Sequence, residues 1–380
     1  MSRTLHIAAL ASYRVFPAKM GGQKGIACFY SYLGVRVPVS FISTKNNEFP
    51  AGFPATFIPL LGNSFLRYVN PFLFFPLRKI LLKDNITHLI LEHPYYGWLG
   101  TLLKWTTKVK LVVHSHNIES LRFKSTGRWW WRILWQYEKF THRRADLNFF
   151  ITGEDEQFAI KHFKLDARRC QTITYGSDAK ESPMPSERSV ARQVLENLYG
   201  IGSNEKILLF NGTLDYKPNL DALMIILNVI NPALMKQAGF NYRIIICGKS
   251  LPANLDELKA YQDKHIIYAG FVDDITVYFK GCDLFINPVT DGGGIKTKLV
   301  EALGYNISCI STESGAIGIP QSITGKKLVL TGDTDWEPFT KAIIDINTQE
   351  NIPNAFYNHF YWGNIADKAA SVLKNTALID

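Results

Sequence analysis

Two runs of short apolar segments, each alternating with helical segments, constrain the fold of this 380-residue chain more than any other feature. Such segments are typical of buried parallel strands. In the first run we expect strands at Leu5–Ala11, Val37–Ile42, His88–Leu91, Lys110–His114 and Leu147–Ile151. In the second run we expect them at Ile207–Phe210, Tyr242–Cys247, Ile266–Ala269, Asp283–Asn287 and Ser308–Ser311. Strands that alternate with helices predict an α/β fold of two Rossmann-like, doubly wound domains.

A polar stretch with two prolines, Tyr175–Ser189, separates the two runs and is a plausible linker. We therefore predict domains at residues 1–180 and 181–355. Residues 356–380 are expected to form a C-terminal helix that packs back toward the N-terminal domain. Two doubly wound domains that face each other would enclose a central cleft at the carboxyl ends of their strands, where ligands of such sheets bind.

Composition indicates a globular protein, with 47% apolar and 20% charged residues. No uninterrupted apolar run approaches the length of a membrane span. The run Leu5–Leu10 is short for a signal peptide, so we interpret it as part of the first buried strand. The five cysteines are scattered without a CxxC pair, which favours reduced thiols in a cytoplasmic protein. The nine histidines show no metal-ligand spacing such as HExxH.

The positive charge is concentrated in the first part of the chain. Residues 1–150 carry a net charge of +14, whereas the remaining 230 residues carry −5. Two segments there are both basic and aromatic or apolar, Phe65–Lys83 and Arg122–Phe140. Such segments suit docking at an anionic membrane surface, and this predicts a peripheral position at its cytoplasmic face. A core helix with a solvated basic face is the alternative, and nucleic acid is not an expected partner because no nucleic-acid-binding motif accompanies the charge.

A glycine loop carries the strongest functional signal. Asp291-Gly292-Gly293-Gly294 follows a predicted strand and precedes a predicted helix, Ile295–Leu303. Glycine amides together with a helix start make an anion site that fits a diphosphate. Lys298, one turn into the helix, would add a full charge, and Glu301 would accept hydrogen bonds from ribose hydroxyls. The alternative is an ordinary flexible loop before a solvated helix.

The order and spacing of further motifs match a known family. The matching pieces are Asn211-Gly212-Thr213, Tyr216–Asn219, Cys247-Gly248-Lys249, Ala269–Asp274, Gly281–Pro288, Lys298–Leu303, Ser311-Thr312 and Gly315–Ile319. With these, Lys206–Pro320 resembles the nucleotide-binding half of GT-B glycosyltransferases, specifically the retaining family four (glycosyl transferases group 1). The resemblance covers about a third of the chain closely and the first half more loosely. It implies an acceptor-binding N-terminal domain and a C-terminal domain that binds a nucleotide-sugar.

The resemblance also assigns roles. It implies that Glu301 binds the ribose, that Lys298 binds the diphosphate and that His116 hydrogen-bonds the donor sugar. The implied donor-binding residues are Gly22, which is expected in the loop after the first strand, and Gly212, Lys217, Asn219, Lys249, Gly270, Phe271, Val272, Gly292, Gly293, Gly294 and Thr297. Glu92 and His93 end a predicted strand and are candidates to meet the acceptor. Two departures stand out: Gly293 replaces a glutamate of many members, and Thr213 replaces a phosphate-binding arginine, for which Lys217 or Lys249 would compensate.

These observations predict a retaining glycosyltransferase of hexosyltransferase type that needs neither a cofactor nor a metal ion, since the sequence has no DxD motif. The donor would be a nucleoside-diphosphate sugar. The acceptor would be a glycan or lipid-linked glycan, in cell-surface polysaccharide or glycoconjugate synthesis. Two alternatives stay open at this point: a nucleotide-sugar epimerase of the same fold, and a non-catalytic subunit that binds nucleotide-sugars.

Overall fold

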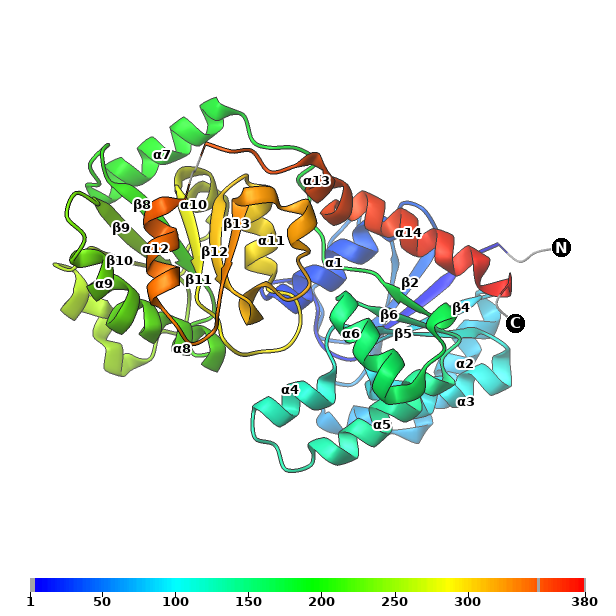
Figure 1. The fold of residues 1–380 in the computed structure, drawn as a ribbon. Coiled ribbons are helices and arrows are strands. Elements are labelled where there is room, and N and C mark those ends of the chain that lie inside the picture. Colours follow the sequence, from blue (N-terminus) through cyan, green and yellow to red (C-terminus); the bar gives the residue numbers. More distant parts are fainter. Residues whose placement is uncertain (1–3, 347–348, 379–380) are drawn as a thin grey trace. The chain divides into compact units, whose positions relative to one another are not determined.

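The computed structural model describes residues 4–346 and 349–378, which form two α/β domains (Figure 1). The first domain runs to Gly176 and resumes at His359, and the second spans Ser177–Asn358. Each domain is built on one sheet whose paired strands run parallel, as the alternating pattern predicts. The expected pair of Rossmann-like domains is therefore confirmed.

The sheet of the first domain has seven strands in the order β3-β2-β1-β4-β5-β6-β7. Their bounds are β1 (Ile7–Ala11), β2 (Val39–Thr44), β3 (Thr56–Leu61), β4 (His88–Glu92), β5 (Lys110–Ser115), β6 (Leu147–Phe150) and β7 (Cys170–Thr172). The chain moves outward from β1 through β2 to β3, then returns to start β4 on the other side of β1. Because the strand order reverses there, the carboxyl ends of β1 and β4 mark the ligand-binding edge of this sheet.

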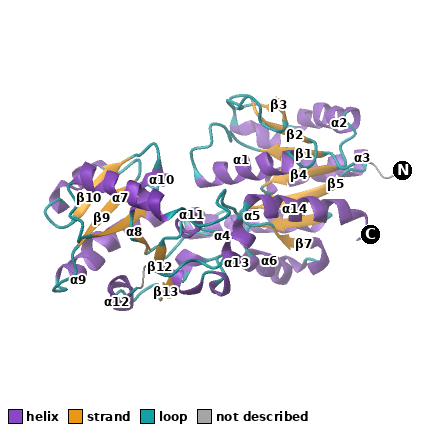
Figure 2. Ribbon diagram, turned by 90° about the horizontal axis from the view of Figure 1, so that it is seen from above, coloured by secondary structure: helices purple, strands orange, loops and turns teal. Residues whose placement is uncertain are grey.

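Helices cover both faces of this sheet (Figure 2). They are α1 (Gly21–Gly34), α2 (Phe74–Lys83), α3 (Gly97–Thr107), α4 (Glu119–Ser125), α5 (Trp131–Arg144), α6 (Gly153–Phe158) and α14 (Trp362–Lys374). Leucines of α2 and α3 pack with Leu10, Leu89 and Leu111 on one face. On the other face α1 contacts α14, and Arg36 of α1 forms an ion pair with Asp367 of α14. Helix α14 therefore belongs to the first domain.

The sheet of the second domain has six strands in the order β10-β9-β8-β11-β12-β13. Their bounds are β8 (Lys206–Asn211), β9 (Tyr242–Cys247), β10 (Ile266–Gly270), β11 (Leu284–Asn287), β12 (Ser308–Thr312) and β13 (Leu328–Thr331). The helices are α7 (Pro185–Tyr199), α8 (Lys217–Ile225), α9 (Asn231–Met235), α10 (Ile275–Gly281), α11 (Thr297–Gly304), α12 (Glu337–Asp345) and α13 (Asn354–Phe360), the last of which crosses the boundary between the domains. Here the strand order reverses between β8 and β11, so ligands are expected at their carboxyl ends.

Two details differ from the sequence-based expectations. The polar linker is shorter than expected, because α7 begins at Pro185, a residue suited to the first turn of a helix. The continuous helix Lys217–Met235, 19 residues long, is apolar enough by length and composition to cross a membrane. Its buried side chains, among them Leu223, Ile226 and Ile230, pack in the core of the second domain.

Candidate functional site

The glycine loop of the second domain follows the end of β11 after three residues, on the strand beside which the strand order of the sheet reverses. Gly292 and Gly294 have φ angles of +96° and +71°, which only glycine adopts readily. Nζ of Lys296 donates to the carbonyl oxygens of Gly292 (2.5 Å) and Gly294 (3.0 Å) and so holds the loop in a compact turn. Side chains other than hydrogen at either glycine would strain this turn.

The helix after the loop starts later than the sequence pattern suggests. The expected start at Ile295 is wrong, because α11 begins at Thr297 and Lys296 occupies the extended N-cap position. The positive φ of Gly294 delays the helix by two residues. Lys298 is consequently the second residue of the helix and lies at its amino end, where the backbone N–H groups are not used within the helix.

Lys298 connects the loop to the neighbouring strand. Its Nζ donates to the carbonyl oxygen of Asn211 and to Oδ1 of Asn219, each at 3.1 Å, and lies 4.4 Å from the ring centre of Phe210. Burial of the ammonium group and the nearby charge of Lys296 lower its pKa to about 7. An anion bound at this place would restore the full charge, so Lys298 is suited to answer a diphosphate.

Close backbone packing surrounds this lysine. A Cβ atom on Gly212 would lie 2.7 Å from Nδ2 of Asn219, and one on Gly248 would lie 2.0 Å from the carbonyl oxygen of Gly212. Asn219 Nδ2 donates to the carbonyl oxygen of Thr213 (3.0 Å) while its Oδ1 accepts from Lys298. The structure thus brings together Gly212, Asn219 and Lys298, three residues that the sequence assigns to the donor.

The approach of the glycine loop to α8 extends this group. A Cβ on Gly292 would lie 3.3 Å from Cγ of Pro218 and 3.5 Å from Oη of Tyr216. Lys217 next to them is exposed and forms an ion pair with Asp221 (2.5 Å), so its charge is already matched by a carboxylate.

The other predicted donor residues occupy strand ends and the first turns of α11. Gly270 ends β10 with a φ of +67° and is followed by Phe271, whose side chain is 66% exposed, and Val272. Lys249 follows β9, and its carbonyl oxygen accepts from the amide of Leu214. Gly293 is exposed in the loop, whereas Thr297 and Glu301 are partly buried on α11. None of these placements assigns a ligand.

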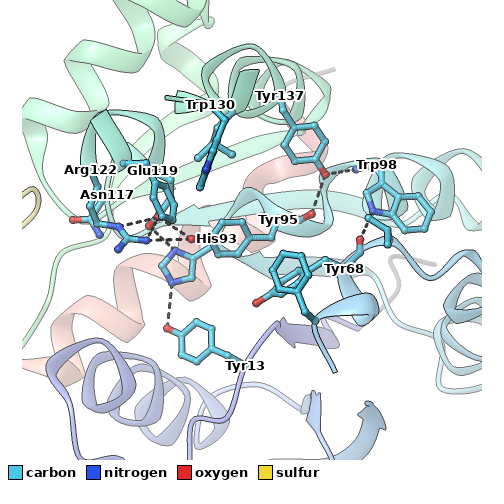
Figure 3. A pocket seen from close by; sticks show the side chains of 14 residues that line it. Tyr13, Tyr68, His93, Tyr95, Trp98, Asn117, Glu119, Arg122, Trp130 and Tyr137 are labelled. Carbon is cyan, nitrogen blue, oxygen red and sulfur yellow. Dashed lines mark hydrogen bonds and ion pairs between the residues drawn. The ribbon is translucent and has the colours of Figure 1, made fainter. Parts of the chain in front are cut away.

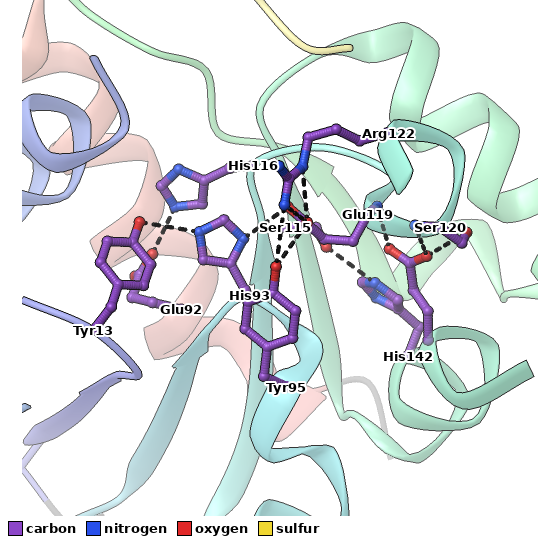
Figure 4. Close-up of polar contacts among 11 residues, drawn as sticks. Tyr13, Glu92, His93, Tyr95, Ser115, His116, Glu119, Ser120, Arg122 and His142 are labelled. Carbon is purple, nitrogen blue, oxygen red and sulfur yellow. Dashed lines mark hydrogen bonds and ion pairs between the residues drawn. The ribbon is translucent and has the colours of Figure 1, made fainter. Parts of the chain in front are cut away.

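In the first domain, Glu92 is the centre of a buried polar cluster at the carboxyl end of β4 (Figure 4). Its carboxylate is 1% exposed and accepts hydrogen bonds from Oη of Tyr30 (2.5 Å), Nδ1 of His114 (3.1 Å) and Nε2 of His116 (2.7 Å). Burial opposes its charge, but the charges and hydrogen bonds of the two histidines hold the pKa of Glu92 well below its ordinary value. Glu92 was predicted to contact the acceptor, but its carboxylate oxygens are buried. The carboxylate is instead placed to orient His116.

The contact with Glu92 fixes the tautomer of His116. Burial, together with the nearby His93, lowers the pKa of His116 to about 4, so the ring is neutral at pH 7. An ionised carboxylate only accepts hydrogen bonds, so the single ring proton of His116 lies on Nε2. Its Nδ1 atom is therefore an acceptor, suited to a donor such as a sugar hydroxyl.

His93 forms a second carboxylate–histidine pair beside the first. Its Nδ1 lies 3.2 Å from Oε1 of Glu119, its Nε2 lies 3.2 Å from Oη of Tyr13, and its ring stacks on that of His116 at 4.5 Å. Its backbone has φ +69° and ψ 159°, a conformation that is costly for any residue except glycine. Glu119 also accepts from Arg122 Nη2 at 2.6 Å. Strain of this kind persists where the surrounding structure holds a side chain in a required place.

Sequence reasoning missed the roles of Tyr13, Tyr30, Glu119 and Arg122 in this cluster. Glu119 lies three residues after His116, so its proximity was readable in principle, but its pairing with His93 depends on the turn after β4. Gly22 was expected in the loop after β1; this is wrong, because Gly22 is the second residue of α1. A Cβ there would lie 3.8 Å from Oη of Tyr13, so the glycine is not required by packing.

Glu92, His114 and His116 also form a group whose ligand atoms lie within 4.8 Å of one another, close enough to hold a metal ion. The facing nitrogen atoms of the two histidines are already hydrogen-bonded to the carboxylate of Glu92, and all three side chains are largely buried. An ion would have to replace these hydrogen bonds.

Comparisons with known proteins agree with this geometry. Residues 205–349 match the family model "Glycosyl transferases group 1", and residues 34–181 match "Glycosyltransferase Family 4". A chitobiosyldiphosphodolichol beta-mannosyltransferase of Debaryomyces hansenii is 25% identical over 238 residues, which make up 58% of this chain and half the length (50%) of that relative.

Solved structures share the fold over nearly the full length of both chains. A sucrose-phosphate synthase from Thermosynechococcus elongatus superposes with a TM-score of 0.76 at 14% identity and covers 99% of this chain and 100% of its own. The Anabaena protein Alr3699/HepE in complex with UDP gives 0.70 at 17% identity and covers 98% and 100%. Because the two family models together account for most of the chain and the fold agrees, this protein belongs to the group 1, family 4 glycosyltransferases of GT-B fold.

Proposed function

We propose that this glycosyltransferase moves a hexose from a nucleoside-diphosphate sugar to a glycan or lipid-linked glycan, with retention of anomeric configuration and without a metal ion. The observation that carries the proposal is the position of Lys298. It joins the glycine loop to the end of β8 at the point where the strand order reverses, with an ammonium group that burial leaves poised to accept an anion.

The second domain would hold the nucleotide. Backbone amides at the start of α11 and the ammonium group of Lys298 would neutralise the diphosphate, and Glu301 on the same helix would accept from the ribose hydroxyls. Ammonium and amide groups stabilise the negative charge that grows on the leaving diphosphate, which is the task that a metal ion performs in other transferases.

The first domain would supply His116 and His93. Nδ1 of His116 would accept from a hydroxyl of the donor sugar, and Glu92 would keep the ring in that tautomer. In the transfer step, the bond between the anomeric carbon and the diphosphate oxygen breaks as the acceptor oxygen bonds to the same face of that carbon. The acceptor proton passes to the leaving phosphate oxygen, so no separate protein base is required.

A nucleotide-sugar screen tests this function. Donors with UDP, GDP and dTDP are compared by thermal shift, and the best one is incubated with candidate acceptors. The proposal expects one donor to stabilise the protein and its sugar to be transferred with retained configuration in the presence of EDTA. An epimerised donor, or binding of the donor without any turnover, would refute transfer and favour the two alternative functions.

We also propose that the first domain attaches to anionic membranes. Large apolar side chains are exposed on Phe65 (79%), Phe72 (74%) and Trp129 (82%), and exposed cations flank them, for example Arg78 and Arg132. Vesicles containing phosphatidylglycerol should sediment the protein at low salt, with much weaker binding at high salt or to neutral vesicles. Equal binding to neutral and anionic vesicles would contradict the electrostatic part, and no binding to either would contradict the attachment.

A further inference from the structure

A large aromatic pocket of the first domain lies beside the histidine cluster, and its aromatic wall has no role in the geometry described so far (Figure 3). Its volume is about 690 Å³, within the range typical of small-molecule sites. The lining comes from four parts of the chain: Tyr13 after β1, the short helix Phe65–Val69, the turn from His93 to Trp98, and the α4–α5 region from Asn117 to Tyr137.

Most of the polar atoms of the aromatic wall are already engaged inside the protein. Oη of Tyr137 donates to the carbonyl oxygen of Tyr95 (2.9 Å) and accepts from the amide of Trp98 (3.1 Å). Nε1 of Trp98 donates to the carbonyl oxygen of Tyr68 (2.9 Å), and Oη of Tyr95 donates to Glu119 (2.7 Å). The wall therefore offers ring faces to an occupant. A sugar needs matched donors and acceptors when it is buried, whereas a hydrocarbon chain does not.

One end of the pocket is polar and lies beside the histidine cluster. It is formed by His93, Asn117, Glu119 and Arg122. Arg122 gives Nε and Nη2 to Glu119, and among the described residues no hydrogen bond is made by its Nη1. The ring of His93 stacks on His116, the residue that would meet the donor sugar. A ligand that fills the pocket would therefore present its polar end toward the proposed reacting group.

The rim at the apolar side is exposed and cationic. Phe65 (79% exposed) and Val69 (68%) line the pocket on one side. Trp129 (82%) and Ile133 (67%), next in the chain to the lining residues Trp130 and Leu134, are also exposed. The only carboxylate between residues 120 and 145 is Glu138, which is buried and accepts from the backbone amides of Glu119 and Ser120. The charged side chains that this region exposes are consequently cations, which complement an anionic amphiphile.

We propose that this pocket binds the hydrocarbon chain of a lipid-phosphate-linked acceptor, with the phosphate at Arg122 and the accepting sugar toward His93. The inference rests on the proposed transferase function and narrows it, because it selects a lipid-linked acceptor over a free glycan. The apolar wall supplies the affinity and the polar end supplies the orientation. Each methylene buried against the rings adds up to roughly fourfold in affinity.

Binding of farnesyl diphosphate, below its micellar concentration, tests the pocket directly through the fluorescence of Trp98 and Trp130, which line it. We expect saturable binding that strengthens from geranyl to farnesyl to geranylgeranyl diphosphate and that excess inorganic diphosphate does not displace. Val69→Trp and Leu134→Trp, which fill the pocket, should each weaken the binding of farnesyl diphosphate at least tenfold. Trp105 lies outside the pocket and is 64% exposed, close to the 68% of Val69. Trp105→Ala should therefore change the affinity for farnesyl diphosphate less than twofold.

The controls separate the possible failures. The proposal would be overturned if both filled variants kept the parent's affinity for farnesyl diphosphate, or if affinity did not depend on the length of the hydrocarbon chain. It would also be overturned if the parent bound a soluble oligosaccharide and the filled variants lost that binding. Thermal stabilisation by the same set of UDP-, GDP- and dTDP-sugars is recorded in parallel on the same samples. If no nucleotide-sugar binds while farnesyl diphosphate does, the transferase function fails and the lipid pocket stands; the reverse result refutes the pocket alone.

Discussion

Replacing Glu92 by glutamine is the sharpest test of the histidine cluster, because the shape is kept and only charge and one acceptor are lost. Tyr30 and His114 both donate to Oε1, whereas His116 donates to Oε2. An amide oxygen at the first position preserves two hydrogen bonds. The amide NH₂ at the second position then faces Nε2 of His116, so that ring must move its proton to Nδ1.

The structure sets the expected size of the effect. A hydrogen bond to a charged group contributes about 1.5–3 kcal/mol and a neutral one about 0.5–1.5 kcal/mol, so three weakened bonds cost about 3 kcal/mol. Relief of the cost of burying the charge offsets part of this, and we expect Glu92→Gln to destabilise the first domain by about 1–3 kcal/mol. Because Nδ1 of His116 changes from acceptor to donor, we expect turnover to fall roughly 10- to 100-fold.

Urea unfolding followed by tryptophan fluorescence measures the stability change, since seven of the eight tryptophans lie in the first domain. The pKa of Glu92 is depressed in the folded state, so its stabilisation is present above the unfolded value of about 4.3 and is lost as the pH falls below it. The difference between parent and variant should therefore shrink in acid. Glu48→Gln removes an exposed carboxylate of the same domain and should change stability by less than about 0.5 kcal/mol.

Two results would refute this reasoning. One is an unfolding free energy of Glu92→Gln equal to that of the parent at pH 7. The other is a nitrogen-15 spectrum of labelled histidine in which His116 keeps its proton on Nε2 in the variant. Affinity for the nucleotide should be unaffected, because Lys298 and Glu301 belong to the other domain; a parallel loss would indicate general misfolding.

Three further results are expected. Because the pKa of Lys298 is about 7 without ligand and a diphosphate raises it, calorimetric affinity for the donor selected by the nucleotide-sugar screen should fall by up to about tenfold per pH unit above 7, and Lys298→Met should lose this dependence. Burial lowers the pKa values of His88, His116 and His142 to about 4, so the stability that their neutral rings contribute is present above pH 6.5 and lost toward pH 4. Urea unfolding should show the free energy of unfolding fall by several kcal/mol over this range, and a constant value would contradict the burial of neutral rings. Gly248→Ala should lower the melting temperature through its clash with Gly212, whereas Gly332→Ala, with open space around it, should not.

The sequence predicted the central strands of both sheets within one or two residues, since each is a continuous apolar run between polar segments. It missed β3, β7 and β13, which lie at sheet edges. β3 is largely accessible and contains Pro59, and β7 has only three residues, so neither shows the buried pattern. The start of α11 was also misplaced, because apolar periodicity does not reveal that Gly294 adopts a positive φ.

The candidate donor residues were readable for a different reason. A glycine loop, a lysine and a glutamate follow one another along β11 and α11, so the chain itself keeps them close. Local order of this kind determines the nucleotide half of the site from sequence alone, and the family models agree with it. The roles of Gly293 and Thr213 stay predictions.

The amino-acid sequence by itself determined the two parallel sheets, the family and the lysine–glutamate helix, because each depends on neighbours along the chain. Tertiary structure decided everything that joins separate strands. It placed Glu92 against His116 from the next strand, paired His93 with Glu119 through a strained turn, and assembled an aromatic pocket from four distant segments. Such contacts follow from strand order and side-chain direction in the folded sheet, and these are quantities that spacing along a chain does not specify.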